Sequence, residues 1–281
     1  MPPPDGSRDR RIEDPSNRWL IHPAARALLP FAIRSGISAN AVSLAGLVLG
    51  AGAGVAFAGW RTPWLAPVGL ALAVCWLVAD GLDGMIARAT GTSSAFGRFM
   101  DGICDHGVFA LIYILLAWSV GTGEGWGLAI AAAVAHAVQS SLYEGERARF
   151  HRRARGVAEA AAAPSANPLV RLYDAVAGSI GRLGRPLEAA MVASADRARF
   201  GRAYAAEAAG PMRLMIPLTA NTRVWLIFLA CVAGRPGIFW WGEIVALTIV
   251  AAAGLVWHRR VEARFAADTS FHRGDRPSSF A

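Results

Sequence analysis

The sequence predicts an all-α integral membrane protein with six transmembrane helices and an N-terminal interfacial amphipathic helix. Two observations carry this prediction. The 281 residues are 54% hydrophobic, with a mean hydropathy of +0.37, which is too apolar for an ordinary soluble domain. The apolar residues also gather in separate runs that approach the length needed to cross a bilayer. The runs cover 39–57, 64–79, 107–120, 126–142, 214–232 and 238–257.

Several of these runs are shorter than the roughly 20 apolar residues that span a membrane. We therefore expect their helices to continue into flanking polar residues such as Asp80 and Asp101. The resulting organisation is a cytoplasmic tail with the interfacial helix, helices one to four, a helical cytoplasmic insertion, helices five and six, and a second cytoplasmic tail. These parts cover 1–38, 39–142, 143–213, 214–258 and 259–281.

The first part divides into two pieces. Residues 1–14 are polar and proline-rich, so we expect a disordered tail. Residues 16–34 mix large apolar side chains with Arg and His, which indicates a helix lying on the cytoplasmic leaflet. Gly36 then breaks that helix, and Ser38 is placed to cap the first membrane helix.

All 28 basic residues are Arg, and 25 of them lie in the two tails, the insertion and the segment between spans two and three. By the positive-inside rule these parts face the cytoplasm. The net charge of +8 suits anionic lipids and phosphate-bearing substrates, and nucleic acid is not an expected partner. Three cysteines without paired spacing predict neither a disulfide framework nor a zinc site.

Four carboxylates stand where apolar runs end. Asp80 and Asp83 are three residues apart, and Asp101 and Asp105 are four apart, so each pair shares one face of a helix. Paired carboxylates are the ligands that hard divalent cations such as Mg²⁺ prefer. The spacing therefore predicts a metal site for phosphate chemistry.

The stretch reads D-x2-D-G-x2-A-R-x8-G-x3-D-x3-D, and in this order it resembles the signature of the CDP-alcohol phosphotransferase (CDP-alcohol phosphatidyltransferase) family. The resemblance implies an enzyme that moves a substituted phosphate group, here a phosphatidyl group, from a CDP-alcohol such as CDP-diacylglycerol to a hydroxyl in phospholipid synthesis, releasing CMP. Every fixed position is matched, by Asp80, Asp83, Gly84, Ala87, Arg88, Gly97, Asp101 and Asp105.

The resemblance also implies roles for these residues. The four aspartates would bind Mg²⁺ or Mn²⁺, as two ions, and Asp105 would also act as general base. The nucleotide and its diphosphate would contact Gly84, Ala87, Arg88 and Gly97, to which we add Ser94 and Asn40. Family members often form homodimers, and a bacterial inner (plasma) membrane location with the site facing the cytoplasm is expected.

The acceptor site is predicted from a polar stripe. Gln139, Tyr143 and Arg147 recur every four residues and so share a helix face, and Arg223 stands isolated in the fifth run. We expect them to bind a small polar, phosphorylated alcohol. The alternative is that the Arg residues only anchor the protein at the membrane. Two other classes also remain open: a Mg²⁺-dependent membrane prenyltransferase, and a small transporter with an acidic pathway.

Overall fold

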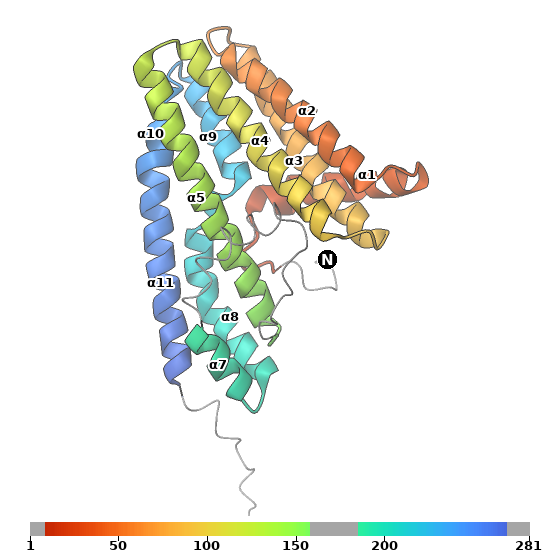
Figure 1. The fold of residues 1–281 in the computed structure, drawn as a ribbon, viewed down its shortest axis with the longest axis vertical. Helices are drawn as coiled ribbons and strands as arrows, with labels where there is room; N and C mark the ends of the chain where they lie inside the picture. The colour runs from red at the N-terminus through yellow and green to blue at the C-terminus, as the bar shows by residue number, and fades with distance from the viewer. Residues whose placement is uncertain (1–8, 158–184, 269–281) are drawn as a thin grey trace, which may run out of the picture.

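The computed structural model describes residues 9–157 and 185–268, and every regular element in them is helical (Figure 1). Before residues 158–184, which are not described, the chain forms one short π-helix and five α-helices, and the remaining elements follow. The elements are η1 (Asn17–Ile21), α1 (His22–Arg34), α2 (Ala39–Ala58), α3 (Leu65–Ala89), α4 (Ala95–Val120), α5 (Gly123–Ala154), α7 (Arg185–Ala193), α8 (Arg197–Leu214), η3 (Ile216–Leu218), α9 (Ala220–Val232), α10 (Gly237–Trp241), η4 (Gly242–Leu247) and α11 (Thr248–Ala267).

Four helical segments of the described chain are long and apolar enough to cross a bilayer: Ala39–Ala58, Leu65–Ala89, Gly102–Val120 and Gly237–Ala267. The last of these joins α10, η4 and α11. Helix α9 is apolar but has only 13 residues, and α5 has 32 residues with a more polar second half. The structure thus gives an all-helical chain with four candidate spans; the crossings predicted for α5 and α9 remain predictions.

Side chains at the helix starts fix where the long helices begin. Ser38 Oγ accepts a hydrogen bond from the Ala41 amide at 3.2 Å, which confirms the predicted cap of α2. Ser94 and Thr122 cap α4 and α5 in the same way. Gly121, with φ of 73°, lets the chain turn sharply from α4 into α5.

Glycines on α2 bring that helix close to both carriers of the aspartate motif. A Cβ atom on Gly50 would lie 2.4 Å from the Val108 side chain of α4, and one on Gly46 would lie 3.3 Å from Trp76 of α3. Trp76 also packs edge-on against Phe109, with ring centroids 5.4 Å apart. Helix α2 therefore packs closely against both α3 and α4, as small residues commonly allow between membrane helices.

Residues 9–14 are not the disordered tail that the sequence suggested. Ile12 is 2% exposed and Asp14 is 6% exposed, because this segment packs into the molecule and bonds to the start of α9. That expectation is wrong for these six residues, and 1–8 lie outside the described residues. After the arm, α1 runs across the ends of α2, α3 and α4 (Figure 1). The helices η1 and α1 leave large apolar side chains exposed, among them Trp19, Leu28 and Phe31.

The predicted insertion is helical where it is described. Helix α5 continues without interruption to Ala154, past the boundary expected at residue 142, and α7 and α8 pack against the far half of α11 (Figure 1). The part of the predicted helical stretch that covers 169–184 lies outside the described residues. A separate apolar core, including Phe150, Phe200, Tyr204 and Phe265, joins these helices.

Candidate active site

The last turns of α3 carry the first two motif aspartates. Asp83 is 5% exposed, and Ser43 of α2 donates a hydrogen bond to its Oδ2 at 2.5 Å. Asp80 lies three residues earlier and is half-buried. The hydroxyl orients the Asp83 carboxylate from a neighbouring helix, as supporting groups around metal ligands commonly do.

Motif residues from two helices line a first cavity of about 340 Å³. Asp80 and Asp83 of α3 and Asp105 of α4 line it, together with Gly84 and Arg88. Asp101 occupies the helical turn before Asp105, and its side chain lies outside the part that the structure describes. Three of the four predicted metal ligands thus meet at one cavity, although they come from two different helices.

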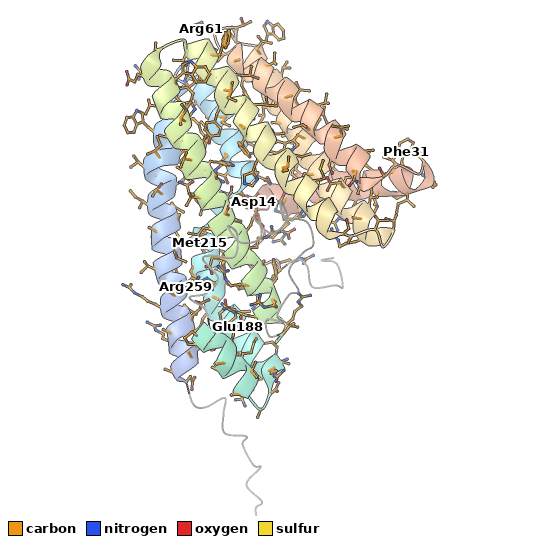
Figure 2. All side chains as sticks on the ribbon, in the orientation of Figure 1. Asp14, Phe31, Arg61, Glu188, Met215 and Arg259 are labelled. Carbon is orange, nitrogen blue, oxygen red and sulfur yellow. The ribbon has the colours of Figure 1, made fainter. Side chains whose placement is uncertain are left out.

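The opposite wall of the first cavity comes from three other segments of the chain. Helix α5 contributes Tyr143 and Arg147, the arm before η1 contributes Asp14, and the start of α9 contributes Thr219 and Asn221. Figure 2 shows Asp14 beside α5 and near the beginning of α1. The cavity therefore lies between the α2–α4 group and the rest of the molecule.

A second cavity, of about 600 Å³, adjoins the first and shares Asp83, Gly84 and Arg88 with it. Its other walls come from the start of α2 and the loop before α4, both rich in small polar residues. They include the predicted nucleotide-binding residues Asn40, Ala87, Ser94 and Gly97, with Ser43, Thr90 and Thr92.

Arg88 stands at the junction of the two cavities because of Gly84. A Cβ atom on Gly84 would lie 3.3 Å from Arg88 Nη1, so the guanidinium lies directly over the glycine, one turn earlier on α3. A Cβ atom at position 84 would make the Arg88 head group shift by a few tenths of an ångström. The glycine and the arginine of the motif thus act as a unit.

A comparison with known protein families matches one segment of the chain to a family model. Residues 37–172 match the family model described as CDP-alcohol phosphatidyltransferase. This segment belongs to the CDP-alcohol phosphatidyltransferase family. It includes the whole aspartate motif with Tyr143 and Arg147, whereas Asp14, Thr219 and Asn221 lie outside it. The comparison with curated proteins returned no match, and neither did the comparison with solved structures.

Arg147 reaches the first cavity, but it already has a carboxylate partner. Its Nη1 lies 3.0 Å from Glu144 Oε2, one turn earlier on α5. The charge of Glu144, against the opposing effect of burial, raises the Arg147 pKa, and Asp80 adds to this effect. Arg147 therefore lies near the motif of this transferase family as a cation paired with the exposed carboxylate of Glu144.

Gln139 and Arg223, which were predicted to bind the acceptor, lie in a buried polar network. Arg223 is 0% exposed and donates to Glu243 Oε1 at 2.9 Å and to Gln139 Oε1 at 2.9 Å. Gln139 in turn donates to the Glu243 carbonyl at 2.9 Å. Neither residue lines the two cavities. They join α5, α9 and η4 in a buried polar network, in which Gln139 and Arg223 pair with Glu243 and with each other.

Sequence reasoning missed several residues of the first cavity. Ser43 could have been found, because it lies one turn after Asn40 on the face that meets Asp83. Asp14, Thr219 and Asn221 could not, because their bonds join positions about 205 residues apart in the chain. His151, which also lines the cavity, lies one turn beyond Arg147 on α5.

A second group of potential metal ligands lies away from both cavities. Oxygen and nitrogen atoms of Glu146, His258 and Glu262 lie within 4.8 Å of one another. Arginines already surround them: Arg149 is 2.6 Å from Glu146, and Arg259 contacts both carboxylates. Burial raises the pKa of Glu146, but His258 and these arginines outweigh that effect and hold the pKa at about 2. The group is an ion network that ties α5 to α11, close to the Glu188 and Arg259 labels in Figure 2.

Proposed function

We propose that this protein is an integral membrane enzyme that transfers a phosphatidyl group from CDP-diacylglycerol to the hydroxyl of a small polar alcohol and releases CMP. The observation that carries the proposal is the meeting of Asp80, Asp83, Asp105 and Arg88 in the first cavity, which shares Asp83 and Arg88 with the second. One cavity can take the nucleotide and the other the acceptor. The family of residues 37–172 supplies the reaction class.

The residues present fit a divalent metal. Their donor atoms are carboxylate oxygens, which Mg²⁺ and Mn²⁺ prefer, and Ser43 already orients one of them. Asp80, Asp83, Asp101 and Asp105 would hold the metal, as two ions. When bound, such ions neutralise the charge that develops on a diphosphate during phosphoryl transfer.

The residues around the motif supply binding and proton transfer. Arg88 offers a planar fork to the donor's diphosphate, and Gly84 and Ala87 leave room for the nucleotide beside α3. Asn40, Ser94 and Gly97 line the same cavity. Asp105 accepts the proton of the acceptor hydroxyl; the new oxygen–phosphorus bond then forms while the bond from that phosphorus to the CMP oxygen breaks.

We include the membrane arrangement in the proposal. Helices α5 and α9 cross the bilayer with the four candidate spans, both termini face the cytoplasm, and α1 lies on the inner leaflet with Trp19 and Phe31 in lipid. Figure 2 places Arg61 at the end of the molecule opposite Glu188 and Arg259, as this orientation requires. A bacterial inner membrane and a homodimer complete the proposed setting.

The acceptor that we propose is a small polar alcohol. The sequence favoured a phosphorylated one, held partly by Arg147. The pairing of Arg147 with Glu144 at 3.0 Å leaves less positive charge for a phosphate than that prediction assumed. The geometry supports Tyr143 and Arg147 as lining residues of the acceptor side and gives no support to the phosphate itself.

The reaction is tested with purified protein in mixed micelles that contain CDP-diacylglycerol, Mn²⁺ and a panel of alcohols. We expect CMP release that depends on the metal and on an alcohol. A prenyl diphosphate consumed in place of CDP-diacylglycerol would favour the prenyltransferase alternative. Ion or solute flux in proteoliposomes without CMP release would favour the transporter and overturn the proposal.

A further inference from the structure

Hydrogen bonds join the N-terminal arm, residues 9–16, to the start of α9 at the first cavity. Asn221 Nδ2 donates to Ser16 Oγ at 2.6 Å and to Asn17 Oδ1 at 2.8 Å. Thr219 Oγ1 donates to Asp14 Oδ2 at 3.0 Å. Both segments lie outside the residues that match the family model.

Asp14 is an acidic residue of that wall and is 6% exposed. Its Oδ1 accepts from the Ser16 amide at 2.8 Å and the Ser16 hydroxyl at 2.5 Å. Its Oδ2 accepts from Thr219. In the described chain every donor that reaches the Asp14 carboxylate is neutral. A carboxylate oxygen accepts about two hydrogen bonds, so Oδ2 retains room for one more.

The other carboxylates around the cavity differ from Asp14 in this respect. Outside the motif, Asp9, Glu13 and Glu144 also line it. Each has a basic partner: Arg11 at 2.6 Å from Asp9, His22 at 2.9 Å from Glu13, and Arg147 at 3.0 Å from Glu144. A phosphate placed in this cavity would meet carboxylates whose charge is balanced only in part, and Asp14 would repel it directly.

We propose that Asp14 is an acceptor-binding residue whose Oδ2 accepts a hydrogen bond from a second hydroxyl or an ammonium group of the acceptor. It thereby selects an unphosphorylated polyol or amino alcohol against the phosphorylated form. Thr219 and Asn221 are positioning residues that hold Asp14 and the arm in place. The inference rests on the proposed function, since it assigns the acceptor of that reaction.

The preference of the wild-type enzyme is the first test. Glycerol and glycerol 3-phosphate differ only in the phosphate, and CMP release from CDP-diacylglycerol reports both. We expect kcat/KM to favour glycerol by about ten-fold or more, the size of one charge-assisted hydrogen bond. A preference for glycerol 3-phosphate overturns the inference and leaves the proposed function standing. No CMP release with either alcohol or with ethanolamine overturns both.

Variants separate contact from positioning. Asp14→Asn should lower kcat/KM for glycerol about ten-fold, keep the KM for CDP-diacylglycerol within about two-fold, and abolish the discrimination against glycerol 3-phosphate. Asn221→Ala should raise the KM for glycerol and weaken the discrimination in part, because Asp14 and the arm are then held less firmly. Asp196→Asn, which keeps the exposed cap of α8, is the matched control and should change nothing. Unchanged discrimination in Asp14→Asn contradicts the assignment; if that variant does not fold, the wild-type preference decides alone.

Discussion

Replacing Arg223 tests whether this arginine stabilises the buried polar network and does not bind the acceptor. Arg223 and Glu243 are both 0% exposed, and their side chains are 2.9 Å apart. Arg223→Met would leave the Glu243 carboxylate buried without its guanidinium partner. Breaking such a pair costs about 3 to 5 kcal/mol. For a chain of this size that corresponds to a fall of about 10 °C in the unfolding midpoint.

The double variant Arg223→Met/Glu243→Gln removes both charges and should regain most of that loss, because neutral groups replace a buried pair at little cost. The assay is thermal unfolding in detergent, followed by tryptophan fluorescence. Arg235→Met, at an exposed turn, is the control and should unfold with the wild type. A single variant as stable as wild type, or a double variant no better than the single one, would refute this reasoning.

Three further predictions concern the site and the topology. Gly84→Ala should shift Arg88, whose Nη1 would lie 3.3 Å from the new Cβ atom, and so raise the KM for CDP-diacylglycerol roughly five-fold. Gly127→Ala is the control, because a Cβ atom there would have no atom within 4 Å. Equal KM values for the two variants would contradict the paired role of Gly84 and Arg88. Burial, helped by the charge of Arg147, lowers the pKa of His151 from 6.5 to about 4. Between these two pKa values the unfolded chain binds a proton at His151 that the folded chain does not, so the stability of the protein falls as the pH drops through this range. The unfolding midpoints at about pH 7 and about pH 4.5 should therefore differ less in His151→Asn than in the wild type. The same pH dependence in variant and wild type would be evidence against this role of His151. In a background without Cys75, Cys104 and Cys231, Gly123→Cys should react with an impermeant maleimide only from the outer face, and labelling from the cytoplasmic face alone would reverse the topology.

The sequence was sufficient for the features that depend on local spacing. The positions of Asp80, Asp83 and Asp105 on helices, and the cap at Ser38, follow from intervals of three or four residues. Residues 40, 84, 87, 88, 94 and 97 line one cavity, as the resemblance to the family signature implied for a nucleotide site.

The features that the sequence did not reveal depend on distant partners. Arg223 resembled a ligand-binding charge because Glu243, its partner, lies 20 positions later in a segment that reads as apolar. Asp14 resembled part of a tail because Thr219 is 205 positions away. Hydrogen bonds of this kind leave no periodic pattern, since nothing in the residues between them reports the contact.

The central claim is that the motif aspartates form one catalytic site, and the Asp105→Asn variant tests it most directly. The measurement is CMP release from CDP-diacylglycerol with Mn²⁺ and a saturating alcohol, for wild type and variant, with and without EDTA. The account predicts that EDTA abolishes turnover and that the variant, folded as judged by its unfolding midpoint, is slower by about two to four orders of magnitude. Turnover by Asp105→Asn at the wild-type rate, or full activity in EDTA, would contradict it.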